Sequence, residues 1–262
     1  MKKIILFIFF VLFLAFIYWL LFPFIVSENN STGEEISGLL RGYTPTFAAL
    51  LTILFTTKRR GFKDYWHNIM RFKASIRSYL AVFLIPLFIN VVVVIVTSQF
   101  IDSSISFIEL NYPKFLAIYF IFIFLDGPLG EELGWRGFLL PEVLSKFSPL
   151  VSSLIIGLVM FFWHIIIFDA DGPELNSSFI IKYLISILGI SVIFTFFYMR
   201  FSKFPIIAVL LHTSINYFIF FRNSLIPEMK ETPVDNITYV VTVVLVAMIC
   251  LILLKNHNLK NN

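Results

Sequence analysis

The stretch GEELGWRG, residues 130–137, places two glutamates and an arginine directly after a long apolar segment. Two further polar clusters stand within apolar segments: Trp163-His164, and the run HTSIN at residues 212–216. A charged side chain at bilayer depth costs ~2.5–3.5 kcal/mol on insertion scales, so an ionisable group there indicates function. Carboxylates, imidazoles and an amide are the groups that a hydrolytic site requires. The three clusters therefore predict an enzyme whose site lies inside a bundle of membrane helices.

The composition is that of a polytopic helical membrane protein. Of the 262 residues, 59% are hydrophobic, 18% are aromatic and only 14% are charged, whereas soluble domains are about 25% charged. The net charge of +4 is modest and lies in the loops, so we expect no nucleic-acid partner. The single cysteine, Cys250, excludes an internal disulfide. Abundant Phe, Ile, Asn and Lys indicate AT-rich coding and a bacterial source.

We expect an all-α fold with about eight transmembrane helices in one bundle, since about 20 apolar residues span a bilayer. The first candidate span is too long for a signal peptide and is expected to be a retained anchor. The organisation that we expect is one structural domain in three parts: N-terminal helices with a basic loop (1–111), a catalytic core (112–221), and a C-terminal helix with a short tail (222–262). The candidate spans are residues 4–26, 43–57, 79–97, 113–130, 150–168, 178–199, 204–221 and 237–254.

The distribution of Lys and Arg predicts a cell-membrane protein with both termini in the cytoplasm. Basic residues concentrate in the loop 58–77, and acidic residues in the loop 169–174 on the opposite side. The loop 58–77 also carries aromatic residues, so it either lies along the inner membrane surface or is an ordinary basic loop. Four basic residues do not fit this orientation: Arg41, Lys114, Arg222 and Lys230.

The first polar cluster separates its two carboxylates if it is helical. Glu132 and Arg136 are four residues apart and lie on one face, where acid-before-base pairing is favourable. Glu131 is rotated by roughly 100° from Glu132. One carboxylate is then neutralised, and the other is free to act as a general base with a raised pKa. A structural ion pair with a spare carboxylate would give the same pattern.

The other two clusters supply imidazoles and an amide. Helical arms over residues 131–146 and 149–164, joined by a turn, would bring Glu131 and His164 to similar depth. Pro141 is expected to kink or break the first arm. His212 and Asn216 are four apart on one helical face and could hold an oxyanion, although for this cluster alone interhelical hydrogen bonds are the simpler use of them.

In this order the clusters resemble the CPBP family (CAAX protease and bacteriocin-processing, or Abi) of intramembrane endopeptidases. Residues 130–137 are similar to that family's first motif, including the glycine after the arginine, and residues 212–216 to its third. The resemblance covers about residues 112–220. One departure is Met160, four residues before His164, where the family usually has phenylalanine.

The resemblance implies hydrolysis of a peptide bond in a membrane-associated peptide or protein, within or near the lipid bilayer. By residue, it implies that Glu131 and His164 activate the attacking water. It implies that His212 and Asn216 stabilise the oxyanion.

The resemblance also bears on the ion pair and on metals. Glu132 and Arg136 would organise the helix. We favour a glutamate-type mechanism with no metal, since the chain has no His-Glu-x-x-His motif. A zinc set of Glu131, His164 and His212 with a water is the alternative.

Two other classes of protein remain open at this stage. A non-catalytic immunity or scaffold protein of the same fold would keep the polar clusters for packing. A transporter or channel would use them as an ion path, but it would favour paired repeats, and the sequence shows no internal repeat.

Overall fold

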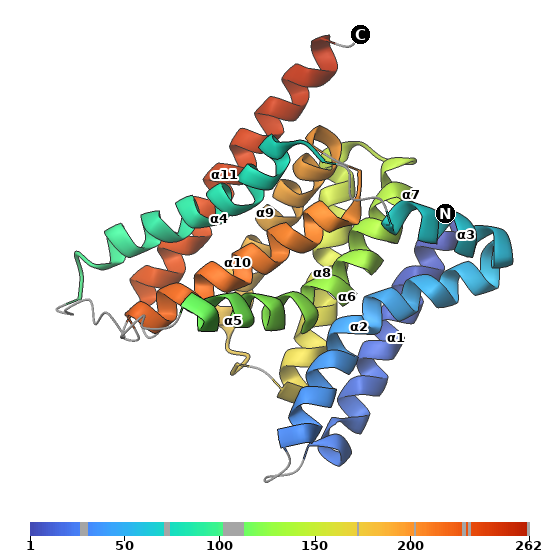
Figure 1. Cartoon of the computed structure of the whole chain (residues 1–262), viewed down its shortest axis with the longest axis horizontal. Coiled ribbons are helices and arrows are strands. Elements are labelled where there is room, and N and C mark those ends of the chain that lie inside the picture. The colour runs from blue at the N-terminus through green and yellow to red at the C-terminus, as the bar shows by residue number, and fades with distance from the viewer. Residues whose placement is uncertain are drawn as a thin grey trace.

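The computed structural model describes residues 1–26, 31–70, 74–101, 113–171, 173–201, 203–226, 229 and 232–260. Within these ranges the chain is helical and contains no strand (Figure 1). The expected all-α, polytopic fold is therefore confirmed. The elements are α1 (Lys2–Ile25), α2 (Ser31–Thr56), α3 (Lys58–Ile69), α4 (Ile76–Thr97), α5 (Pro113–Leu125), α6 (Pro128–Gly134), η1 (Trp135–Leu139), α7 (Leu140–Leu144), α8 (Pro149–Asp171), α9 (Ser177–Arg200), α10 (Pro205–Leu225) and α11 (Pro233–Lys260).

The described residues include seven helices long and apolar enough to cross a membrane, one fewer than the sequence predicts. The difference lies at residues 113–130, which do not form one span. Helix α5 has 13 residues, or about 20 Å at 1.5 Å per residue, and the hydrocarbon core is about 30 Å thick. The chain breaks at Gly127, and α6 starts at Pro128, which lacks an N–H and so suits a first helical turn.

The second expected span is longer than the sequence indicated. Helix α2 starts at Ser31, and its apolar part covers Ile36–Thr56. The N-terminal end of α1 and the C-terminal end of α11 both lie toward the upper right of Figure 1. This arrangement agrees with seven spans plus one broken crossing, while the assignment of that side to the cytoplasm stays a prediction.

The buried apolar side chains form two clusters. The first joins α1, α2 and α8 with η1 and α7. The second joins α4, α9, α10 and α11. Helix α6 contacts both α2 and α10 and lies near the centre of the molecule (Figure 1). The polar residues of α6 are therefore placed at the seam between the two halves.

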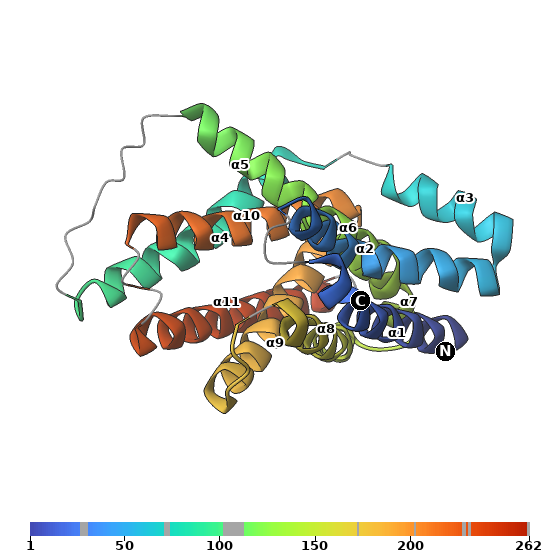
Figure 2. The same cartoon turned by 90° about the horizontal axis from the view of Figure 1, so that it is seen from below.

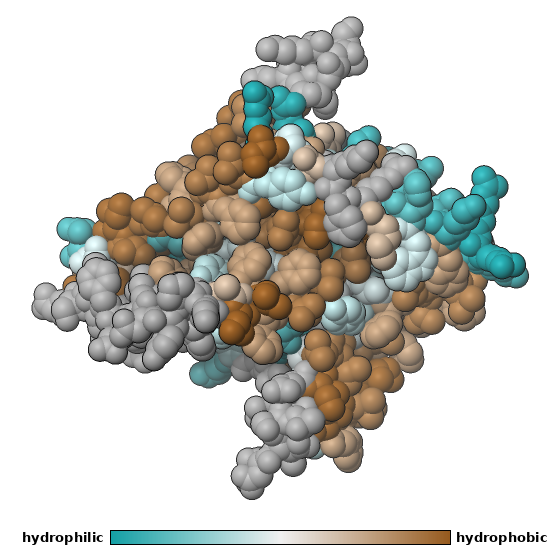
Figure 3. Space-filling model, in the orientation of Figure 1, coloured by the Kyte–Doolittle hydropathy of each residue, from teal (hydrophilic) through white to brown (hydrophobic). Residues whose placement is uncertain are grey.

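The outer surface of the helix bundle is largely apolar, as expected of a surface in contact with lipid. Large apolar side chains are exposed along α1, α4 and α11, among them Phe9, Phe88 and Ile252. Apolar residues cover most of the face in Figure 3, and hydrophilic residues gather over α3. Contiguous apolar surface of this extent is rare on soluble monomers and is suited to lipid.

Helix α3 projects from one end of the bundle, as Figure 2 shows. It packs through Tyr65 and Ile69, and the Tyr65 hydroxyl donates to the Leu133 carbonyl at 3.2 Å. Burial raises the pKa of this hydroxyl. Trp66 on the same helix is exposed. Part of the predicted surface loop, residues 71–73, lies outside the described ranges, and its placement on the membrane surface stays a prediction.

Candidate active site

Two glycines bring α6 directly onto α2. A Cβ atom added to Gly134 would lie 2.4 Å from the carbonyl oxygen of Pro45, and one added to Gly130 would lie 2.6 Å from that of Gly42. The Thr46 hydroxyl donates to the Gly130 carbonyl. Since these contacts are with backbone, no side chain fits at either glycine. The glycines thus fix the height and rotation of the two glutamates between them.

The helix widens immediately after α6. Residues Trp135–Leu139 form a π-helical turn, closed by a hydrogen bond from the Leu140 N–H to the Trp135 carbonyl. Pro141 follows at the start of α7. In an uninterrupted α-helix its ring would clash with the carbonyl four residues earlier. The expected kink at Pro141 therefore takes the form of a wide turn, a feature often found at functional sites.

The ion pair predicted from the spacing of Glu132 and Arg136 is present. Arg136 Nη1 lies 3.0 Å from Glu132 Oε1, and neither side chain is more than 1% exposed. The same carboxylate oxygen accepts a hydrogen bond of 2.9 Å from His212 Nδ1. Glu132 therefore pairs with Arg136 one turn along the chain and also links α6 to α10. The sequence did not reveal the second of these contacts.

Arg136 has further contacts across the seam. Its guanidinium carbon lies 4.1 Å from the centroid of the Phe194 ring on α9, and Nη1 lies 3.4 Å from the sulfur of Met160. A cation above an aromatic face in a desolvated site is attracted by the ring quadrupole. Met160, which departs from the family motif, thus contacts the arginine directly, and a soft thioether fills this irregular position.

His164 is oriented by its own helix. Its Nδ1 lies 2.8 Å from the Met160 carbonyl oxygen, which can only accept, so Nδ1 carries the hydrogen. In the neutral ring Nε2 then has a free lone pair. The neighbouring Trp163 is fully buried and donates from Nε1 to the Thr44 hydroxyl at 2.9 Å, which fixes α8 against α2.

The turn between the two expected helical arms is as predicted. The Val151 N–H donates to the Ser148 hydroxyl at 3.4 Å, and α8 begins at Pro149. This turn brings α8 back beside α7. Glu131 and His164, which we expected to reach similar depth, line the same cavity.

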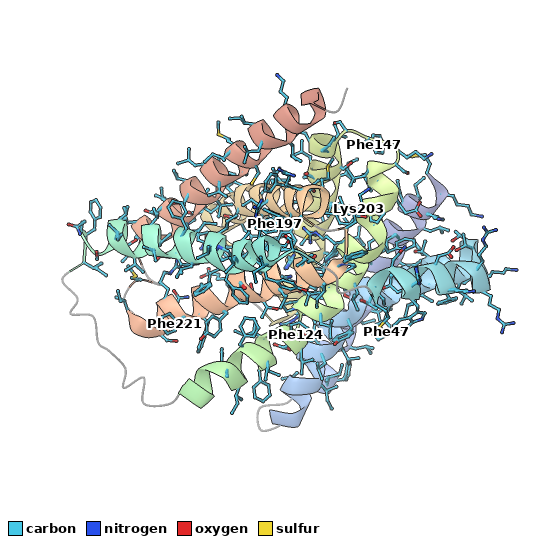
Figure 4. All side chains as sticks on the ribbon, turned by 45° about the horizontal axis from the view of Figure 1, so that its top comes forward. Phe47, Phe124, Phe147, Phe197, Lys203 and Phe221 are labelled. Carbon is cyan, nitrogen blue, oxygen red and sulfur yellow. The ribbon has the colours of Figure 1, made fainter. Side chains whose placement is uncertain are left out.

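The four predicted catalytic residues meet at one cavity of about 690 Å³. Glu131 is 8% exposed, and its Oε2 is buried without a hydrogen-bond partner among the described residues. Asn216 is exposed to the cavity. Aromatic contacts line the walls, including Tyr119 of α5, whose ring centroid lies 3.9 Å from that of Phe220. The labelled Phe124 and Phe221 locate α5 and α10 in Figure 4. The cavity also touches Arg41, Glu132, Met160, His164, Tyr183 and His212.

The described residues contain no group of three or more His, Cys, Asp or Glu side chains that could hold a metal ion. His164 and His212 both use Nδ1 in other hydrogen bonds, so only Nε2 of each ring is left for a ligand. The zinc set of Glu131 with these two histidines does not converge on one point in this arrangement. Metal dependence stays a prediction.

Sequence reasoning missed several lining residues. Arg41 and Arg222, which did not fit the orientation of the loops, both line the cavity, as does Tyr183, whose ring centroid is 5.5 Å from that of His164. The one sequence feature that pointed to Arg41 and Arg222 was that they did not fit the positive-inside rule. Lys114 and Lys230 fit that rule no better, and their side chains lie outside the described part of the chain.

Fold and site together define a class: a multi-pass membrane protein with buried carboxylates and histidines around one cavity. Residues 113–218 match the family model for the type II CAAX prenyl endopeptidase, Rce1-like. The chain is also 22% identical over 213 residues to CAAX prenyl protease 2 of Methanococcus maripaludis, covering 77% of this chain and 78% of that protein. The resemblance found in the three motifs is confirmed, and it supports a membrane endopeptidase in general.

Proposed function

We propose that this protein is an intramembrane endopeptidase that hydrolyses a peptide bond of a membrane-associated protein by a glutamate-type mechanism. The observation that carries the proposal is the unequal use of two adjacent carboxylates. Glu132 is held by Arg136 and His212. Both carboxylates have a buried Oε2 without a partner, but among the described residues no ion pair or side-chain hydrogen bond engages either oxygen of Glu131, which lines the cavity. A buried carboxylate without a protein partner is a natural acceptor for a proton from water.

The first half of the reaction is activation of water. Glu131 accepts a proton from a water molecule whose oxygen attacks the carbonyl carbon of the substrate. The free lone pair of His164 Nε2 accepts a hydrogen bond from the other O–H of that water and so orients it, while this hydrogen stays on the attacking oxygen. The proton on Glu131 then passes to the amine nitrogen as the peptide bond breaks.

The second half is stabilisation of the oxyanion. The Asn216 amide donates one hydrogen bond to it. His212 already donates from Nδ1 to Glu132, so it can donate from Nε2 only when the ring carries both protons. In that form the Glu132 carboxylate, which accepts from Nδ1, is the counter-ion of the ring. Glu132 therefore has a part in the chemistry besides its structural pairing with Arg136.

The substrate is a peptide segment that reaches the cavity from the membrane. The names of the related proteins indicate prenylated proteins as one class to test. The chain would then act on a cytoplasmic, lipid-anchored segment, given that the loop charges predict the basic end of the bundle to be cytoplasmic. A scaffold or immunity protein of the same fold would bind without cleaving.

Purified protein should cleave a membrane-tethered peptide, and Glu131→Gln should abolish cleavage while insertion and folding stay intact. Glu142→Gln is the matched control, because Glu142 pairs with Lys3 away from the cavity. Products are separated by mass spectrometry, and folding is followed by circular dichroism. Equal activity of wild type and Glu131→Gln would refute the mechanism, and no cleavage of any prenylated or unprenylated substrate would favour the scaffold function.

A further inference from the structure

The cavity has a second polar end, where α10 meets α11. Arg222 Nη2 lies 3.0 Å from Asp235 Oδ2, and the two residues are 6% and 4% exposed. The Arg222 guanidinium carbon lies 5.8 Å from the centroid of the Tyr239 ring. All three residues line the cavity that contains the candidate catalytic groups, together with Asn223 and Asn236.

The pairing between Arg222 and Asp235 is incomplete. An arginine and a carboxylate can form two parallel hydrogen bonds, which would satisfy both ends of the fork. Here one bond forms, and Arg222 Nη1 and Asp235 Oδ1 are buried without any partner among the described residues. Most buried polar atoms in proteins are hydrogen-bonded. A purely structural link between the two helices accounts for the one bond but not for the two unpaired atoms.

The two unpaired atoms specify the chemistry of a partner. Nη1 is a donor and Oδ1 is an acceptor, while the pair as a whole is neutral. An anion would be repelled by Asp235, and a cation would be repelled by Arg222. A neutral group that offers one acceptor and one donor fits both atoms. A residue of an extended peptide does this, because its C=O and N–H point to the same edge of the strand.

We propose that Arg222 and Asp235 form a docking subsite for the main chain of an extended peptide substrate. The proposal rests on the endopeptidase function and adds to it a means of substrate recognition. Arg222 Nη1 donates to a substrate carbonyl, and Asp235 Oδ1 accepts from a substrate amide. Because only main-chain atoms are bound, this subsite selects extended segments over helical ones, whose amides are already paired.

The position of the subsite sets its distance from the reacting bond. Arg222 follows Asn216 by six residues on α10, which corresponds to about 9 Å along the helix. An extended peptide advances about 3.3 Å per residue. The bound peptide group therefore lies about three residues from the bond held at Asn216.

The test measures binding of an acylated oligoalanine peptide amide to the Glu131→Gln protein in detergent, by fluorescence anisotropy. A set of analogues is compared with this parent peptide. Each analogue has an ester oxygen in place of the N–H at one position, which removes one main-chain hydrogen-bond donor. We expect one ester position to weaken binding about tenfold, as for loss of a hydrogen bond to a charged group. In Arg222→Met/Asp235→Leu on the same background both hydrogen bonds are lost, so the parent peptide should bind about a hundredfold more weakly, and no ester position should matter.

The matched control is Lys3→Met/Glu142→Leu, which removes an ion pair outside the cavity and should retain the full ester dependence. Each protein is first checked for its helical content and a single elution peak. The subsite is overturned if no ester weakens binding, if the dependence survives in the double variant, or if the parent peptide does not bind. Cleavage by wild type is scored separately, so the endopeptidase function can hold while this subsite fails, and the reverse.

Discussion

Replacing Arg136 by methionine should destabilise the protein strongly. Arg136 is 1% exposed, and it is 3.0 Å from Glu132, whose side chain is completely buried. Without the arginine, the Glu132 carboxylate remains in the seam with His212 as its hydrogen-bond partner among the described residues. A buried charge that loses its main partner is costly because no water replaces that partner.

The size of the effect follows from the contacts. Breaking a buried ion pair from one side costs ~3–5 kcal/mol. Loss of the contact between Arg136 and the Phe194 ring, at 4.1 Å, contributes up to about 2 kcal/mol of this when the site is desolvated. At 1.4 kcal/mol for each factor of ten, the unfolding equilibrium should shift by about two to four powers of ten.

A double-mutant cycle separates the pair from its parts. Glu132→Leu alone should also be strongly destabilising, because it leaves Arg136 charged and unpaired. Glu132→Leu/Arg136→Met should regain most of the lost stability, since an apolar pair of similar volume often replaces a buried ion pair at little cost. Turnover should not return in the double variant, because His212 Nδ1 has lost its acceptor.

The assay is reversible unfolding in mixed micelles, followed by far-ultraviolet circular dichroism, with turnover measured on the same preparations. Lys3→Met is the control, since its pair with Glu142 is partly exposed and such pairs contribute about 0–1 kcal/mol. Unfolding of Arg136→Met like wild type would show that the ion pair does not stabilise the fold. A double variant whose loss of stability equals the sum of the two single losses would show that Glu132 and Arg136 are not coupled.

Three further predictions concern topology, packing and metal. A reporter fused after Leu254 should lie on the cytoplasmic side and one within residues 169–174 on the other side; reporters on the same side would contradict the eight crossings. Gly134→Ala should lower the free energy of unfolding by ~1–3 kcal/mol, because the new Cβ meets backbone at 2.4 Å. Gly137→Ala, whose Cβ has its nearest contact at 3.3 Å, should lower it less. Equal losses in the two variants would show that close packing of α6 on α2 does not require glycine at position 134. Prolonged chelation should leave turnover intact, and elemental analysis should find well under one metal per chain. A zinc ion whose removal abolishes activity and whose return restores it would contradict the metal-free mechanism. Asn216→Ala should lower turnover by ~10²–10³, because one oxyanion donor is lost.

Local features of the site could be predicted from the sequence because they depend on helical geometry alone. The Glu132–Arg136 pair follows from a four-residue spacing. The start of α8 at Pro149 follows from the missing N–H of proline, which suits a first helical position. These features need no knowledge of how the helices pack.

Contacts between helices could not be predicted in the same way. The hydrogen bond between His212 and Glu132 joins residues 80 positions apart, and it depends on the rotation of α10 against α6. The π-helical turn at Trp135–Leu139 depends on packing as well as on Pro141. The misfit of Arg41 and Arg222 with the loop charges did carry information, since both side chains line the cavity.

The position of the site at the seam has a consequence for when activity can arise during synthesis. Glu131 and His164 lie on elements beside the first cluster of buried side chains, and His212 packs beside the second. Chains fold from the N-terminus as they are made, and α10 enters the membrane after α6 and α8. Under the proposed mechanism, an unfinished chain would have the water-activating pair but no oxyanion donors. Hydrolysis would then have to wait for the two halves to dock, and a nascent or half-assembled protein would not cut its neighbours in the membrane.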